Sequence, residues 1–374
     1  MRFSTRSGVG AERSPFARAV QSARAAGALL DLTPTNPTRV DLPTPTDATL
    51  AMLSSPTVLD HSPAPFGLGP AREAVAAAIG ADPDRVLLTA STSESYGLLF
   101  RLICDPGDVV LAPEPGYPLF DHLARFDGVG LERYPLLFDG AWSPSIPDAV
   151  EDNVRGLLVV SPNNPTGTVF RDPDWAAVRR LGLPVIVDEV FAPYPLEGPS
   201  SDAANVSLPL RFVLGGLSKS CGLPQLKLGW IRVEGDDALV REALDRLAIL
   251  ADAYLSVGTP VQVAARALLE AGAPFREATR VRLSANLATL RAATEGTVID
   301  VPTVDGGWYA CLRVPATQTD EVWALALLER GIVVQPGYLF DLAPGEWLVV
   351  SLLTPEATFT EGMTALVRHV EAST

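Results

Sequence analysis

From about residue 70, short apolar runs alternate with helix-like stretches along this chain of 374 residues. Each run has the length of a buried strand, and continuous apolar strands suit a parallel sheet that is covered on both faces. The alternation indicates βαβ units and therefore an α/β domain with a mostly parallel sheet. The five runs lie at 86–89, 109–112, 156–160, 185–187 and 212–214.

The regions on either side of this pattern predict a second, smaller unit. Residues 1–60 contain many Pro, Thr and Ser residues and one helix-like patch, and they indicate an arm or surface loop. We predict an N-terminal arm with part of the small domain at 1–45, a large domain at 46–260 and a small α+β domain at 261–374. The remaining predicted helices are 14–30, 241–256, 262–271, 274–294, 319–330 and 359–371, and the remaining strands are 308–314 and 347–352.

The charge balance excludes several classes of partner. The formal net charge is −15, whereas nucleic acids and anionic membranes require a basic face. No apolar run approaches membrane-spanning length, and the N-terminus lacks the apolar segment of a signal peptide. The three cysteines and three histidines are too scattered for a disulfide framework or a zinc site, so we expect a cytoplasmic protein without metal.

Chemically useful side chains follow the first three apolar runs. Ligands of parallel α/β sheets bind outside the carboxyl ends of the strands, so these positions matter most. Thr92 and Ser93 follow the first run at a predicted helix start, which suits either a phosphate site or plain helix capping. Tyr117 could stack on a flat ring or be structural. Asn164 stands in Ser-Pro-Asn-Asn-Pro-Thr-Gly (161–167), a rigid turn that would fix its amide.

A carboxylate and an amine follow the last two runs. Asp188 comes directly after a buried strand, so it needs a cationic partner such as a protonated ring nitrogen, unless it is a helix cap or part of an internal ion pair. Lys219 and Lys227 are the only lysines beside 27 arginines. A lysine can lose its proton and attack a carbonyl, which arginine cannot do, although drift in an arginine-rich chain would also leave two lysines.

These features, in this chain order, resemble the class I/II pyridoxal-phosphate (PLP) aminotransferases of fold type I. The resemblance runs from about residue 31 to 365, and its most specific parts are Asn-Asn-Pro-Thr-Gly (163–167) and Ser-Lys-Ser-Cys-Gly-Leu-Pro-Gln-Leu-Lys-Leu-Gly-Trp (218–230). It implies a large domain with a mostly parallel sheet flanked by helices, a smaller α+β domain, pyridoxal 5′-phosphate as cofactor and a homodimer.

The resemblance also implies a role for each residue. Lys219 matches the lysine that forms the Schiff base and then shuttles the proton, and Asp188 matches the partner of the pyridine nitrogen. Asn164 would donate to the ring O3′, and Tyr117 would stack on the ring. The expected phosphate contacts are Thr92, Ser93, Ser218 and Lys227, the last at a place where the family usually has arginine.

Three further departures from the family pattern indicate an atypical pocket, and the last of them points either to a substitute arginine or to a substrate without an α-carboxylate at that place. Phe191 replaces a tyrosine that donates to O3′, for which Tyr194 is a possible substitute. Neither His61 nor Ser62 is the tyrosine that a partner subunit lends to the phosphate. Val349 stands where an arginine usually binds the substrate carboxylate. Arg39 and Arg313 are candidate substitutes.

We therefore expect an aminotransferase that moves an amino group from an amino donor to a keto or aldehyde acceptor. The substrate would be an amine, an amino aldehyde or a modified amino acid. A PLP-dependent lyase or decarboxylase of the same fold is the alternative. A ligand-sensing regulator is disfavoured, because the chain is acidic and leaves no room for a DNA-binding domain.

Overall fold

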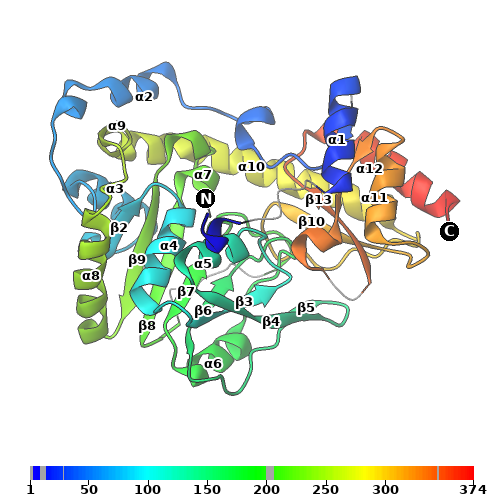
Figure 1. Cartoon of the computed structure of the whole chain (residues 1–374). Helices are drawn as coiled ribbons and strands as arrows, with labels where there is room; N and C mark the ends of the chain where they lie inside the picture. Colours follow the sequence, from blue (N-terminus) through cyan, green and yellow to red (C-terminus); the bar gives the residue numbers. More distant parts are fainter. Residues whose placement is uncertain (1–2, 9–13, 28, 199–205, 343–344) are drawn as a thin grey trace.

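The chain forms an α/β fold around an eight-stranded mixed sheet (Figure 1). The computed structural model describes residues 3–8, 14–27, 29–198, 206–342 and 345–374. The strand order is β2-β9-β8-β7-β6-β3-β4-β5, in which β3, β4, β6, β7 and β8 are parallel and β9 and β5 run the opposite way. The strands are β2 (Val86–Thr89), β3 (Val109–Glu114), β4 (Gly130–Phe138), β5 (Trp142–Pro144), β6 (Val154–Val160), β7 (Val185–Asp188), β8 (Leu210–Gly216) and β9 (Gly229–Gly235).

The predicted apolar runs are confirmed as strands β2, β3, β6, β7 and β8. Strands β4, β5 and β9 were not predicted. Their sequences are less uniformly apolar, since β4 alternates buried and exposed side chains and contains Pro135. β9 carries Arg232 and Glu234 in its middle and end.

Helices cover both faces of this sheet. Strand residues such as Phe212 and Leu214 pack with α4 (Thr92–Ile103), α5 (Phe120–Asp127) and α8 (Asp237–Asp252). Trp230 and Leu88, on the opposite face, pack with α3 (Gly69–Ile79) and the start of α10 (Ala265–Thr294). Alternate strand residues thus pack into apolar clusters on the two faces of the sheet, which explains why the runs are apolar throughout. The helix α6 (Asp172–Leu181) covers the face shared with α10.

Residues from both ends of the chain build two smaller sheets. β10 (Tyr309–Val314), β13 (Glu346–Ser351) and β12 (Gln335–Pro336) form an antiparallel sheet, and β1 (Leu30–Asp31) pairs in parallel with β11 (Ile332–Val333). α1 (Pro15–Ala26) lies beside α11 (Asp320–Leu328), and α12 (Glu356–Ala372) completes this part (Figure 1). The arm is therefore tied to the C-terminal third. Short α2 (Asp47–Ala51) and α9 (Thr259–Val263) both contact α10, and Figure 1 shows them at the end of α10 that is remote from the small sheets.

The predicted break at Pro274 was wrong. In place of helices at 262–271 and 274–294, the single helix α10 runs from Ala265 to Thr294 with Pro274 inside it. A proline removes one hydrogen bond and strains the preceding turn. Here Leu268 and Leu269 before it and Phe275 after it are buried, so packing on both sides holds the helix together. Figure 1 shows α10 crossing from the large sheet to the small ones. The predicted helix at 241–256 begins earlier, as α8, and ends at Asp252.

Candidate active site

A cavity of about 190 Å³ lies at the carboxyl ends of the parallel strands. Seven of the eight residues predicted from the sequence line it: Thr92, Ser93, Tyr117, Asn164, Asp188, Ser218 and Lys219. They arrive from β2, β3, β6, β7 and β8, which end at the same edge of the sheet. The topology therefore brings together side chains that are up to 127 positions apart in the sequence (from Thr92 to Lys219).

Asp188 is the last residue of β7 and is buried. Its Oδ2 accepts a hydrogen bond of 2.6 Å from the Tyr96 hydroxyl, and its Oδ1 accepts one of 3.1 Å from the Val190 amide. Burial raises the pKa of the Asp188 carboxyl, while these two hydrogen bonds oppose the rise. The site thus contains a fixed carboxylate that gains from a cationic neighbour.

Lys219 stands in the short helix α7 (Leu217–Ser220), directly after β8. Its Nζ lies 4.8 Å from the ring centre of Trp308 and 5.7 Å from that of Phe191. Burial lowers the pKa of the Lys219 amine to about 8, although the Asp188 carboxylate acts in the opposite direction. A lysine of lowered pKa is the usual form of a nucleophilic amine.

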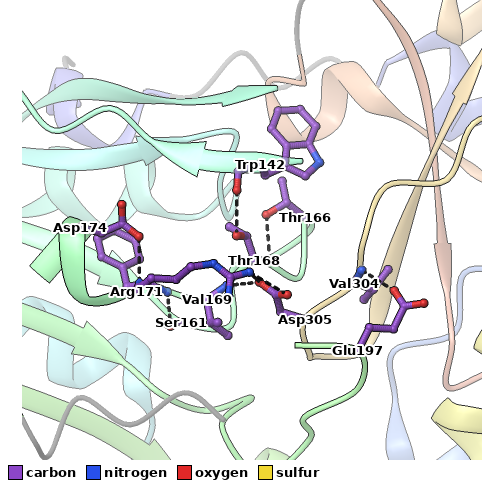
Figure 2. Close-up of polar contacts among 11 residues, drawn as sticks. Trp142, Ser161, Thr166, Thr168, Val169, Arg171, Asp174, Glu197, Val304 and Asp305 are labelled. Carbon is purple, nitrogen blue, oxygen red and sulfur yellow. Dashed lines mark hydrogen bonds and ion pairs between the residues drawn. The ribbon is translucent and has the colours of Figure 1, made fainter. Parts of the chain in front are cut away.

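Asn164 is held by a turn that hydrogen bonds fix on several sides. Figure 2 shows the segment that follows the turn, where the Val169 amide and the Arg171 guanidinium both bind the buried Asp305 carboxylate, at 3.1 and 2.9 Å. Thr168 Oγ1 also donates to the Trp142 carbonyl at 3.2 Å. Asn164 is 7% exposed, and its Oδ1 has no hydrogen-bond partner within the described residues. This atom marks a place for a polar ligand group.

Helix α4 begins at the cavity. Ser91 caps it by accepting from the Glu94 amide at 3.3 Å, so the first-turn amides next to Thr92 and Ser93 are oriented toward a possible anion. Tyr117 is 37% exposed, and its ring makes an edge contact with Phe120. The Tyr117 ring therefore retains a free face for a flat ligand.

Several residues singled out in the sequence lie outside this cavity. Lys227 is exposed, in left-handed conformation (φ 53°), and is not part of the lining. Val349 is fully buried in β13 opposite Cys311. Arg313 is exposed and stacks on Phe138 and Trp347, so it does not replace the missing arginine. The remaining candidates outside the lining are Arg39 and His61, both exposed, and Ser62.

The Tyr194 hydroxyl donates to the backbone carbonyl of Lys219. It supports the lysine segment from behind and does not line the cavity. Within the described lining, the side chains that carry charge are therefore Lys219 and Asp188 alone.

Three of the lining residues that the sequence analysis did not single out carry a hydroxyl group and come from different parts of the chain: Thr35, Tyr96 and Tyr309. Thr35 comes from the N-terminal arm, and Tyr309 comes from β10. No local pattern could have identified either residue, because their approach depends on the packing of the arm and the small sheet. Tyr96 could have been predicted from the sequence, because it lies four residues after Thr92 and therefore on the same face of α4.

The structure and its comparison with solved structures identify the fold class of this protein. The fold matches that of the alanine aminotransferase from Pyrococcus furiosus with a TM-score of 0.87 and 22% identity, over 99% of this chain and all of the other. This is the architecture of the fold type I PLP enzymes.

Sequence comparison identifies the family. The family description "Aminotransferase class I and II" matches residues 35–366. A histidinol-phosphate aminotransferase from Aliivibrio fischeri is 30% identical over 68% of this chain and 71% of its own length. An S-alkyl-thiohydroximate lyase from Arabidopsis thaliana is 29% identical over 52% of this chain and 45% of its own length. The chain spans about half the length of several curated relatives that it matches. It belongs to the class I and II aminotransferase family.

The cavity fits the cofactor of this family, pyridoxal 5′-phosphate. The unpartnered Asn164 Oδ1, the buried Asp188 carboxylate and the α4 amides offer contacts to a polar, partly cationic, phosphorylated ring. Lys219 is placed to hold an aldehyde. No cluster of three or more metal-ligating side chains occurs in the part of the chain that the structure describes.

Proposed function

We propose that this protein is a PLP-dependent aminotransferase that transfers an amino group from an amino donor to a keto or aldehyde acceptor. The observation that carries the proposal is the placement of Lys219, with its lowered pKa, in one cavity with the buried Asp188. When bound, PLP supplies the reactive aldehyde and an electron-accepting ring.

In this proposal each site residue has a defined role toward the cofactor. The Lys219 amine would hold the cofactor aldehyde, and it would move a proton to and from the substrate carbon. The Asp188 carboxylate, oriented by Tyr96, would keep the ring nitrogen protonated. Asn164 would bind the ring hydroxyl, and Tyr117 would cover the ring. Thr92, Ser93 and Ser218 would hold the phosphate at the start of α4. Lys227, the remaining predicted phosphate contact, lies outside the lining.

The absorption spectrum of the protein purified with PLP tests the proposal. We expect a visible band from lysine-bound cofactor in the wild type and in Lys227→Ala, and no such band in Lys219→Ala. Transfer activity should fall at least about a thousandfold in Lys219→Ala. An unchanged band in Lys219→Ala contradicts the proposal.

A second candidate is a PLP-dependent lyase or decarboxylase. The lyase among the relatives favours it, and so does a described lining that contains no arginine. A panel of amino donors distinguishes the reactions. Accumulation of pyridoxamine phosphate indicates transamination, whereas release of ammonia with a keto acid, or of carbon dioxide, indicates the second candidate.

We also propose a cytoplasmic homodimer with domains at 1–45, 46–260 and 261–374. Three free cysteines suit a reducing compartment. The division follows the sheets, since the large sheet lies between residues 86 and 235 and the three-stranded sheet between 309 and 351. Sedimentation should give twice the chain mass of 39.6 kDa, and a monomer alone contradicts the dimer.

Among the described residues, no helix is long and apolar enough to cross a membrane.

A further inference from the structure

A second cavity, of about 460 Å³, lies behind the lysine segment. β8 and β9, the helix α10 and the segment after β7 form its walls. Val190 and Gly216 line both cavities, so the backbone that carries Asp188 and Lys219 separates them. Its volume is in the range of small-molecule sites.

The lining of this second cavity is strongly cationic. Arg232, Arg276 and Arg280 contribute three guanidinium groups, against the single lining carboxylate of Glu189. This excess of positive charge stands out in a chain whose net charge is −15. A concave surface with one sign of charge attracts the opposite ion.

Arg232 is buried with incomplete compensation. It is 7% exposed, its Nε has no hydrogen-bond partner among the described residues, and Glu234 Oε1 lies 3.4 Å from that Nε. Glu234 Oε2 accepts from Arg211 Nε at 2.6 Å. One carboxylate is thus shared by two buried guanidinium groups. A buried charge of this kind gains strongly from an added counterion.

Backbone carbonyls orient the other two arginines toward the same space. Arg276 Nη1 donates to the Ser220 carbonyl at 3.1 Å, and Arg280 Nε donates to the Pro193 carbonyl at 2.8 Å. Glu277 Oε2 lies 3.7 Å from Arg280 Nη1, and both side chains are largely exposed, so this pair is weak. A guanidinium has five donors and binds carboxylate or phosphate through two of them at once.

The rest of the wall is apolar. Trp230, Leu269 and Ile79 line it together with Val213. We propose that this cavity binds a small organic anion, whose carboxylate or phosphate group pairs with Arg232, Arg276 and Arg280 and whose apolar body packs against Trp230 and Leu269. The site requires no amino transfer, so its failure leaves the proposed function standing.

Calorimetric titration of the cofactor-loaded protein tests the site, because the cofactor then fills the first cavity. The probes are benzoate and phenyl phosphate, which distinguish the two anionic groups, and neutral benzyl alcohol. We expect saturable binding of at least one anion at one site per chain, and none of the alcohol.

Arg280→Gln should weaken this binding about tenfold or more, since it removes one charged donor pair. Arg280 is exposed, so the variant should fold. Arg246→Gln, on the surface of α8, is the matched control and should bind as the wild type does. The proposal is overturned if neither anion binds saturably, or if both variants bind with wild-type affinity.

Discussion

At the scale of single residues, burial acts on Lys219 and Asp188 in opposite directions and favours the neutral form of each. The pKa of Lys219 falls to about 8, and that of Asp188 rises. The fixed hydrogen bonds of Asp188 limit its rise, so the pair combines a reactive amine with a carboxylate that can hold a cation. The proposed chemistry requires both properties: an amine that can lose its proton, and a carboxylate that can bind a cation.

The lowered pKa predicts how cofactor capture depends on pH. Below about pH 8 the Lys219 amine is protonated and unreactive, and above that pH it is neutral. The rate at which the apoprotein takes up PLP should therefore rise with pH and level off above about 8. Stopped-flow absorbance measures this rate. A midpoint near the ordinary lysine value of 10.5 contradicts the prediction.

Tyr96→Phe removes the 2.6 Å hydrogen bond to Asp188. Hydrogen bonds to charged groups contribute about 1.5–3 kcal/mol, so PLP affinity should fall about tenfold or more as the carboxylate loses a donor. Equilibrium titration of the apoprotein with PLP measures this. Tyr134→Phe is the control, because its equally buried hydroxyl donates to the Leu158 carbonyl and not to Asp188. This variant should change the stability of the protein but not its PLP affinity. Equal losses in both variants contradict the assignment.

The sequence identified the residues that follow the strands, because the carboxyl ends of parallel strands share one edge. It could not identify Thr35 or Tyr309, which reach the cavity through tertiary packing. It also suggested Arg313 as a carboxylate partner, although the side chain lies on Phe138 and Trp347. In a strand, neighbouring side chains point to opposite faces, so a residue near the site in sequence can face away from it.

At the scale of elements, the segment after β6 depends on Asp305. This carboxylate is 3% exposed and binds both the Val169 amide and Arg171. Asp305→Asn should lower the free energy of unfolding by about 1–3 kcal/mol, because charged hydrogen bonds are lost. Urea denaturation measures it. Asp148→Asn, which breaks the exposed pair with Arg180, should change it by less than about 0.5 kcal/mol. Similar values for the two variants contradict this role.

Element types were predictable where periodicity is strong, and element ends were not. The parallel strands follow from uniform apolar runs. Helix α10 continues through Pro274 because buried residues on both sides outweigh a local cost of about 3 kcal/mol. The presence of Pro274 in the sequence indicates this cost, but the sequence does not reveal the tertiary packing that offsets it.

At the scale of the whole molecule, the cavity joins three parts of the chain. Thr35 comes from the arm, Asp188 and Lys219 from the large sheet, and Tyr309 from the small sheet. A ligand that binds only the folded state stabilises it by about 3 kcal/mol at a hundredfold excess over its Kd. Removal of PLP should therefore lower the melting temperature in scanning calorimetry. Lys219→Ala should show a smaller difference between loaded and cofactor-free protein, and an equal difference contradicts the contribution of Lys219.

The pairing of Leu30–Asp31 with Ile332–Val333 has a consequence for synthesis on the ribosome. The arm is made first, but its partner strand emerges about 300 residues later. The large sheet, complete by residue 235, can form while the arm is still unattached. Lys219 and the strands of the large sheet are therefore synthesised before Tyr309, the lining residue from the small sheet. A measurement of PLP binding by ribosome-stalled chains that end before residue 309 would show how much of the site forms before the chain is complete.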